Sequence, residues 1–192
     1  MNPQIILKAA LTAATLVIVT NTALPAPIVY PANGHYYDVI DGALTWDAAN
    51  AAATSSSFLG TFGHLATITD AAENLFLTNT FGAVALDLHW LGGFQPVGSS
   101  EPDGGWSWVT GEPFAFNNWA AGEPNNFGDE NRIIFAHPVN ANGKPWNDTI
   151  ANGSAGYVVE YAVPEPSSAL LLLSGAFIFL RRRSLRTYER SA

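Results

Sequence analysis

The chain has 192 residues, with eight lysines and arginines against sixteen aspartates and glutamates, which gives a formal net charge of −8. Positions 27–163 hold fourteen of these acids but only two of the bases. Such an acidic segment makes nucleic acid and anionic membrane poor partners and suits metal cations. The chain has no cysteine, so burial of aromatic rings has to replace disulfides as a source of stability.

The first 26 residues have the features of a secretory signal peptide. Lys8 precedes a mildly apolar stretch at 9–19, and Ala23 and Ala26 are candidate cleavage positions. Residues 27–163 are then long enough for one ordinary domain.

The pattern of this domain predicts an α+β fold. In chain order it predicts a strand at 36–40, a helix at 46–53 capped by Thr45, a short strand at 63–68, a helix at 70–78 opened by a capping box between Thr69 and Glu73, a strand at 88–94 and a closing strand at 157–161. Between 95 and about 149 the chain is rich in Gly, Pro, Asn and Trp, with short apolar runs at 106–109 and 132–135. A loop of this length is typically functional, and its tryptophans argue against disorder.

The last 29 residues, 164–192, fall into three parts. Pro164-Glu165-Pro166 is followed by the apolar run 169–180, and Arg181-Arg182-Arg183 ends the run. The run is shorter than the roughly 20 residues of an ordinary spanning helix. With Ser167, Ser168 and snorkelling arginines included it could just cross a membrane, and the arginines favour a cytoplasmic end. The alternative is a buried C-terminal helix, which the clustered arginines disfavour.

This tail resembles the PEP-CTERM sorting signal of Gram-negative bacteria that secrete extracellular polysaccharide. The resemblance implies export and a transient tether in the inner membrane through a short transmembrane segment. It further implies cleavage by a sorting transpeptidase, an exosortase, near Pro164, Glu165 and Pro166. The product is then expected at the outer surface or in the extracellular matrix.

Several short motifs follow one another through the domain in a set order. They are Thr45-Trp46, Ala72-Glu73-Asn74, Trp90-Leu91-Gly92, Trp106-Ser107-Trp108-Val109, Glu123-Pro124-Asn125, Trp146-Asn147-Asp148 and Gly156-Tyr157-Val158-Val159-Glu160-Tyr161. Together they resemble the C-type lectin domain family. The resemblance implies a C-type lectin-like fold, with two short helices, small antiparallel sheets and a long calcium-binding loop.

In that family, side-chain oxygens of the long loop bind one Ca²⁺. Carried over to this chain, the ligands are Glu123, Asn125, Glu130, Asn147 and Asp148. All offer the hard oxygen atoms that calcium takes, typically six to eight of them. The resemblance also makes Glu123, Asn125, Glu130 and Asn147 the residues that contact a carbohydrate, whose vicinal hydroxyls fill the open positions.

One ligand remains open between two neighbours. Shifting the motif alignment by one residue exchanges Glu130 for Asp129 as the third carboxylate. Glu130 is preferred because it leaves Ile133 and Phe135 in alternating, buried positions of the strand that follows.

The Glu-Pro-Asn order resembles the mannose-type members of the family, which implies ligands such as mannose, glucose, fucose or GlcNAc-like sugars, and a cis bond before Pro124. A calcium-stabilised protein-binding or adhesion module without sugar binding is the alternative. The sequence contains no Gly-x-Ser-x-Gly, no His-Glu-x-x-His, no phosphate loop and no cysteine nucleophile, so an enzyme is not expected. Two converging carboxylates of a glycan-processing enzyme are a less favoured interpretation.

Overall fold

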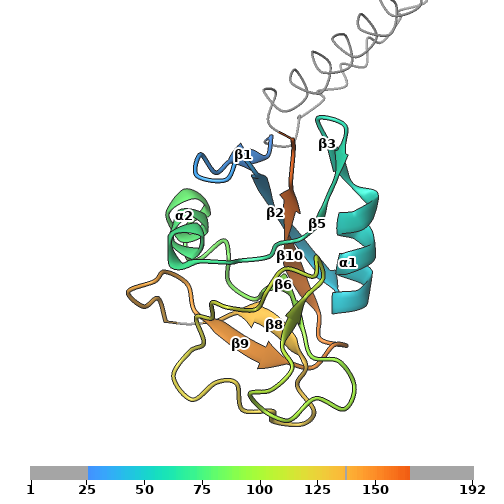
Figure 1. The fold of residues 1–192 in the computed structure, drawn as a ribbon, viewed down its shortest axis with the longest axis vertical. Coiled ribbons are helices and arrows are strands. Elements are labelled where there is room, and N and C mark those ends of the chain that lie inside the picture. The colour runs from blue at the N-terminus through green and yellow to red at the C-terminus, as the bar shows by residue number, and fades with distance from the viewer. Residues whose placement is uncertain (1–25, 137, 165–192) are drawn as a thin grey trace, which may run out of the picture.

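The computed structural model describes residues 26–136 and 138–164 of the chain (Figure 1). Within these residues it contains two helices and ten strands. In chain order they are β1 (Ile28–Val29), β2 (Tyr36–Leu44), α1 (Trp46–Ser55), β3 (Ser57–Phe58), β4 (Thr61–Phe62), β5 (His64–Leu65), α2 (Ala71–Phe81), β6 (His89–Phe94), β7 (Ser107–Trp108), β8 (Arg132–Phe135), β9 (Trp146–Thr149) and β10 (Ala155–Tyr161). The predicted α+β class is confirmed.

Strand β10 is the centre of an eight-stranded sheet, although it is the last strand of the domain. The strand order is β1-β2-β10-β6-β8-β9, with β5 also paired to β10 and β7 paired to β6. Strand β10 runs antiparallel to β2 and β5 and parallel to β6. Most of the expected small antiparallel sheets are thus joined into one mixed sheet, and in the described part of the chain only the β3–β4 hairpin stands apart from it.

The sheet has a hydrophobic core on each face. Helix α1 contributes Trp46 to one core, and helix α2 contributes Leu77 to the other. Figure 1 shows the two helices on opposite sides of β2 and β10. Strand β8 serves both cores, because Ile133 and Phe135 enter one and Ile134 enters the other. The expected burial of Ile133 and Phe135 is confirmed, but Ile134 is only 6% exposed, so the strand alternates between two cores and not between core and solvent.

Tryptophan burial replaces the missing disulfides. Trp46, Trp90, Trp106, Trp108 and Trp146 are all buried. Buried indoles need a partner for the ring N–H, and those of Trp46 and Trp90 each donate to a backbone carbonyl at 2.8 Å. These side chains therefore supply both apolar burial and links between distant segments.

Both helices begin at polar caps. The Thr45 hydroxyl accepts from the Ala48 N–H at 3.3 Å, as predicted. The predicted capping box at Thr69 is wrong, because Asp70 caps α2 by accepting from the Glu73 N–H at 2.8 Å. The Glu73 carboxylate does reach back to the Thr69 N–H and hydroxyl, but the helix begins one residue later than expected, at Ala71.

The strand predictions need two corrections. The strand expected at 63–68 is limited to His64–Leu65, after which the chain crosses toward α2. Residues 146–149, expected within the loop, form strand β9 instead. The polar pair Asn147 and Asp148 hides this strand, because its apolar alternation is broken.

Across residues 26–136 and 138–164, no helix is long and apolar enough to cross a bilayer. The predicted signal peptide lies outside these residues except for Ala26. The predicted sorting signal and transmembrane segment lie outside them as well, except for Pro164.

Candidate functional site

The predicted site residues come from strand β9 and from the long segment between β7 and β8. Asn147 and Asp148 lie on β9, where Asp148 is in register with Ile133 of β8. Glu123 and Asn125 belong to the loop, and Glu130 lies two residues before β8. The rigid β8–β9 pair thus positions one half of the site, and the loop supplies the other.

The Asp148 carboxylate anchors the loop to the sheet. It is fully buried and accepts from the Asn125 N–H at 3.0 and 3.1 Å and from the Asn126 N–H at 2.8 Å. A buried carboxylate needs such charge-assisted hydrogen bonds to offset its lost hydration. The Glu123–Pro124 bond is cis, as the resemblance implies.

Glu123 faces an environment that disfavours its negative charge. Its Oε2 atom is buried and has no hydrogen-bond partner among the described residues. Burial raises the pKa of Glu123 to about 7, and the negative charges of Asp148 and Glu130 add to the rise. Glu123 is therefore within electrostatic reach of Asp148.

Glu130 is the third carboxylate of this group. Its Oε2 accepts from the Phe127 N–H at 3.0 Å. Burial raises its pKa, the Phe127 hydrogen bond opposes that rise, and the Asp148 charge adds to it. Asp129, its alternative as a ligand, is exposed and has a left-handed backbone with φ of 71°.

The two asparagines of the predicted site are held by local hydrogen bonds. The Asn125 Oδ1 accepts from the Phe127 N–H at 2.7 Å. The Asn147 amide donates to the Asp148 carbonyl oxygen. Asn126 fixes the loop by accepting from the Glu130 N–H at 2.8 Å. Its Asx-type contact could have been expected from the Asn-rich sequence of the turn.

The donor set fits a hard divalent cation in charge and chemistry. The charges of Asp148 and Glu130 both act on Glu123, and one buried oxygen of Glu123 lacks a partner among the described residues. The two bases of the domain act elsewhere: Lys144 pairs with Asp87 at 2.6 Å, and the Arg132 guanidinium stacks 4.5 Å from the centre of the Trp46 ring. As the side chains stand, the described segments contain no group of three or more His, Cys, Asp or Glu arranged to hold a metal ion. Glu130, held by the Phe127 N–H, would have to turn toward the other two carboxylates.

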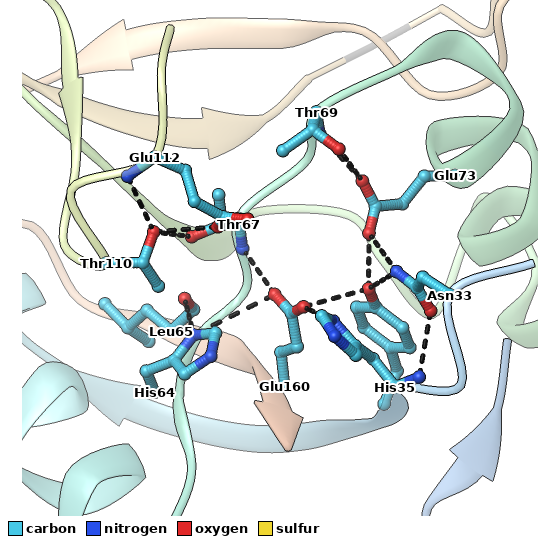
Figure 2. Close-up of polar contacts among 11 residues, drawn as sticks. Asn33, His35, His64, Leu65, Thr67, Thr69, Glu73, Thr110, Glu112 and Glu160 are labelled. Carbon is cyan, nitrogen blue, oxygen red and sulfur yellow. Dashed lines mark hydrogen bonds and ion pairs between the residues drawn. The ribbon is translucent and has the colours of Figure 1, made fainter. Parts of the chain in front are cut away.

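A second polar cluster lies inside the fold and was not predicted. Figure 2 shows Glu73 of α2 and Glu160 of β10 directed toward each other. The Tyr37 hydroxyl lies between them: it donates to Glu73 and is 3.1 Å from Glu160. Asn33 donates to Glu73 at 3.2 Å, and His35 lies 2.6 Å from Glu160.

This buried cluster ties three elements together. Glu160 also accepts from the Thr67 N–H at 2.9 Å, and His64 lies 3.8 Å from it. The pKa of His35 is raised mainly by the hydrogen bond between His35 and Glu160. The pKa of Glu73 is raised mainly by burial. The cluster joins β2, α2 and β10 and serves the fold. The signal for it in the sequence is Glu160, a lone acid within the apolar run 157–161.

Comparison with known proteins agrees with both sequence resemblances. Residues 162–184 match the family described as the PEP-CTERM protein-sorting motif. An alpha-N-acetylgalactosamine-specific lectin of Patiria pectinifera is 26% identical over 129 residues, which is 66% of this chain and 73% of the lectin. Halomucin of Haloquadratum walsbyi is 30% identical over 152 residues, which is 72% of this chain but only 2% of halomucin.

Solved structures give the same fold. The C-type lectin CEL-I from Cucumaria echinata has a TM-score of 0.55 and 26% identity, with 66% of this chain and 89% of that chain covered. An EPNH mutant of CEL-I has a TM-score of 0.58 at the same identity, covering 72% and 96%. A calcium-independent type II antifreeze protein, at 23% identity and a TM-score of 0.56 over 71% and 92%, shares the fold alone. The chain therefore carries a domain with the C-type lectin fold, followed by a PEP-CTERM protein-sorting motif.

Proposed function

We propose that this protein is an exported, calcium-dependent carbohydrate-binding protein of the cell surface or exopolysaccharide matrix, with mannose-type selectivity and no enzymatic activity. The observation that carries the proposal is the Glu123–Asp148 carboxylate pair beside Glu130, with a buried oxygen of Glu123 left without a partner among the described residues. Such an arrangement of negative charge favours a cation. The lectins named among its relatives support a sugar as the ligand.

Glu123, Asn125, Glu130, Asn147 and Asp148 would hold the Ca²⁺ ion. When bound, the ion supplies coordination positions that two neighbouring sugar hydroxyls can occupy. The carboxylates of Glu123 and Glu130 accept hydrogen bonds from such hydroxyls, and the amides of Asn125 and Asn147 donate to them. The order of acceptor and donor along Glu123-Pro124-Asn125 is the basis for proposing mannose-type ligands, although the Patiria pectinifera relative is named for N-acetylgalactosamine.

Calorimetric titration tests this function in two steps. The purified protein is titrated first with CaCl₂ and then, with calcium present, with mannose, fucose, GlcNAc, galactose and GalNAc. We expect calcium binding in the range of roughly 10⁻⁴–10⁻³ M, followed by binding of the mannose-type sugars. The double variant Asn147→Ala, Asp148→Ala should lose both, whereas Asp103→Asn, which removes an exposed acid elsewhere in the loop, should keep both.

The alternative function is a calcium-stabilised protein-binding or adhesion module. The calcium-independent antifreeze protein makes this alternative concrete, because it has the same fold but is named for an activity other than sugar binding. Calcium binding without any saccharide on a broad glycan array would favour this alternative. Absence of calcium binding would contradict the proposed metal site itself.

The proposed route to the surface uses the tail. An inner-membrane tether through 164–192 and cleavage by an exosortase-type transpeptidase near Pro164, Glu165 and Pro166 would release the domain outward. Changing these three residues to alanine should leave an uncleaved chain, detected as an unchanged mass in the membrane fraction. Normal processing of that variant would contradict the route.

A further inference from the structure

One end of the domain is formed where β10 runs out toward the sorting motif. Val29 of β1 pairs with Tyr36 of β2, and Tyr36 pairs with Tyr161 at the end of β10. The ring of Phe58 in β3 lies 5.0 Å from that of Tyr36 and 5.8 Å from that of Tyr161. We call this region, made of β1, the start of β2, the β3–β4 hairpin and residues 161–164, the tail end.

The tail end lies opposite the candidate site. Figure 1 shows β1, β3 and the end of β10 at one pole of the molecule and the long loop with β9 at the other. A chain held by its C-terminal tail would therefore direct the candidate site away from whatever holds the tail.

Apolar side chains are exposed at the tail end. Leu59, at the tip of the β3–β4 hairpin, is 65% exposed, and Phe62 is 72% exposed. Ile28 and Val29 of β1 are exposed as well. Several large apolar side chains on one end of a domain indicate a surface that is covered in some functional state.

Charge distinguishes this end from the rest of the domain. Residues 26–37, 48–69 and 161–164 contain no Asp, Glu, Lys or Arg, although the domain as a whole has fourteen acids. Acidic surfaces are repelled by anionic lipid, so the strongly acidic domain can approach such a membrane only through a face without acids. The residues that form the tail end carry no acid.

The residues that follow the tail end indicate that a lipid surface covers it. Twenty-eight residues follow position 164, and the apolar run begins at Ala169, five residues later. Five residues span at most about 18 Å when fully extended. If the run enters a bilayer, the tail end must lie within roughly that distance of the lipid surface.

We propose that, while the tail holds the chain in the inner membrane, the tail end rests on the lipid surface and inserts Leu59 and Phe62 into the headgroup region. This inference rests on the membrane tether of the proposed function. The β3–β4 hairpin acts as a second, reversible contact beside the tail, in the way that exposed aromatic and aliphatic side chains anchor proteins at membrane interfaces. It fixes the orientation of the domain before release.

Site-directed spin labelling of the full chain tests this contact, and the absence of cysteine makes single labels clean. Phe62→Cys reports on the tail end. Phe127→Cys is the matched control, because Phe127 is an equally apolar ring, 84% exposed, in the loop beside the candidate site. Leu172→Cys reports on the apolar run. Each variant is reconstituted in vesicles of phosphatidylethanolamine and phosphatidylglycerol, and its accessibility to oxygen and to a water-soluble nickel complex is measured.

The inference predicts that the label at 62 is accessible to oxygen and protected from nickel, as in lipid, while the label at 127 is accessible to nickel. A label at 62 that nickel reaches as freely as at 127 overturns the inference. Protection at 62 from both reagents also overturns it, because the cover is then protein, either the tail or a second copy. If the label at 172 is accessible to the nickel complex, the membrane tether and the inference are both contradicted. If the label at 172 is in lipid while the label at 62 is in water, only the inference is contradicted.

Discussion

Replacing Glu123 by glutamine should have opposite effects with and without calcium. Without the ion, the ionised Glu123 is repelled by Asp148 and Glu130, and burial raises its pKa to about 7. The glutamine side chain carries no charge, and its amide can donate to Asp148. The variant Glu123→Gln should therefore be more stable than the wild type in chelator at pH 8, even though it removes a proposed ligand.

The size of the effect follows from the pKa. The pKa of Glu123 rises from the ordinary 4.5 to about 7 in the folded state, and each pKa unit corresponds to about 1.4 kcal/mol. The ionised carboxylate therefore destabilises the fold by at most about 3–4 kcal/mol above pH 7. Glu123 is only half-buried, and solvent screening reduces this to about 1–2 kcal/mol. Because the folded-state pKa is raised, the penalty is present above pH 7 and disappears as the pH falls toward 4.5, where the carboxyl is protonated in both states.

Calcium should offset the stability advantage of the variant and, toward the tighter end of the expected affinity, reverse the order. At about 10 mM calcium and the dissociation constants expected above, the wild type gains roughly 1.4–2.7 kcal/mol by mass action, and Glu123→Gln loses this gain. Thermal unfolding followed by tryptophan fluorescence measures both effects, with an expected rise of about 3–8 °C for the variant in EDTA at pH 8. Asp103→Asn controls for the loss of one exposed charge. A variant less stable than the wild type in EDTA would refute the inferred repulsion.

Three further outcomes are expected. The pKa of His35 is raised chiefly by its hydrogen bond to Glu160, so the stability that His35 contributes is full below about pH 6.5 and lost as the pH rises through its folded-state pKa. In urea denaturation between pH 5.5 and 8.5, the free energy of unfolding of His35→Gln should therefore depend less on pH than that of the wild type. An unchanged pH dependence would contradict this assignment. Gly93→Ala should lower the free energy of unfolding by about 1–3 kcal/mol in the same assay, because the new Cβ would lie 2.2 Å from the buried Cδ1 of Ile133. An unchanged free energy of unfolding would mean that the Ile133 side chain can move aside. Asp129→Asn should retain the calcium-dependent rise in melting temperature, because its side chain is exposed, and losing that rise would make Asp129 the ligand.

The sequence was sufficient for those parts of the fold in which local signals agree with the tertiary structure. Thr45 followed by an alanine-rich run predicts helix α1, and the structure has it. The start of α2 is ambiguous in the sequence because Thr69 and Asp70 are both good N-caps. In the structure Asp70 caps the helix, while Thr69 donates to Glu73, which is buried beside Tyr37. Local pattern alone cannot separate two neighbouring caps.

The candidate site shows the same limit. The positions of Glu123 and Asn125 could be inferred from a short motif, but Asn147 and Asp148 were expected in a loop and lie on β9. Their strand is defined by pairing with β8, a contact that no local pattern contains. That Asp148 binds the loop through backbone N–H groups likewise depends on three-dimensional structure.

The central place of β10 has a consequence for the order of synthesis. Translation produces β10 last, yet β2, β5 and β6 all pair with it, so a nascent chain that stops before residue 155 has the outer strands of a sheet without its middle. Only a chain complete to Tyr161 can close both cores, and the sorting motif begins at the very next residue. The domain is thus complete at Tyr161 and the address for delivery only at residue 184, so a chain that stops before residue 155 has neither.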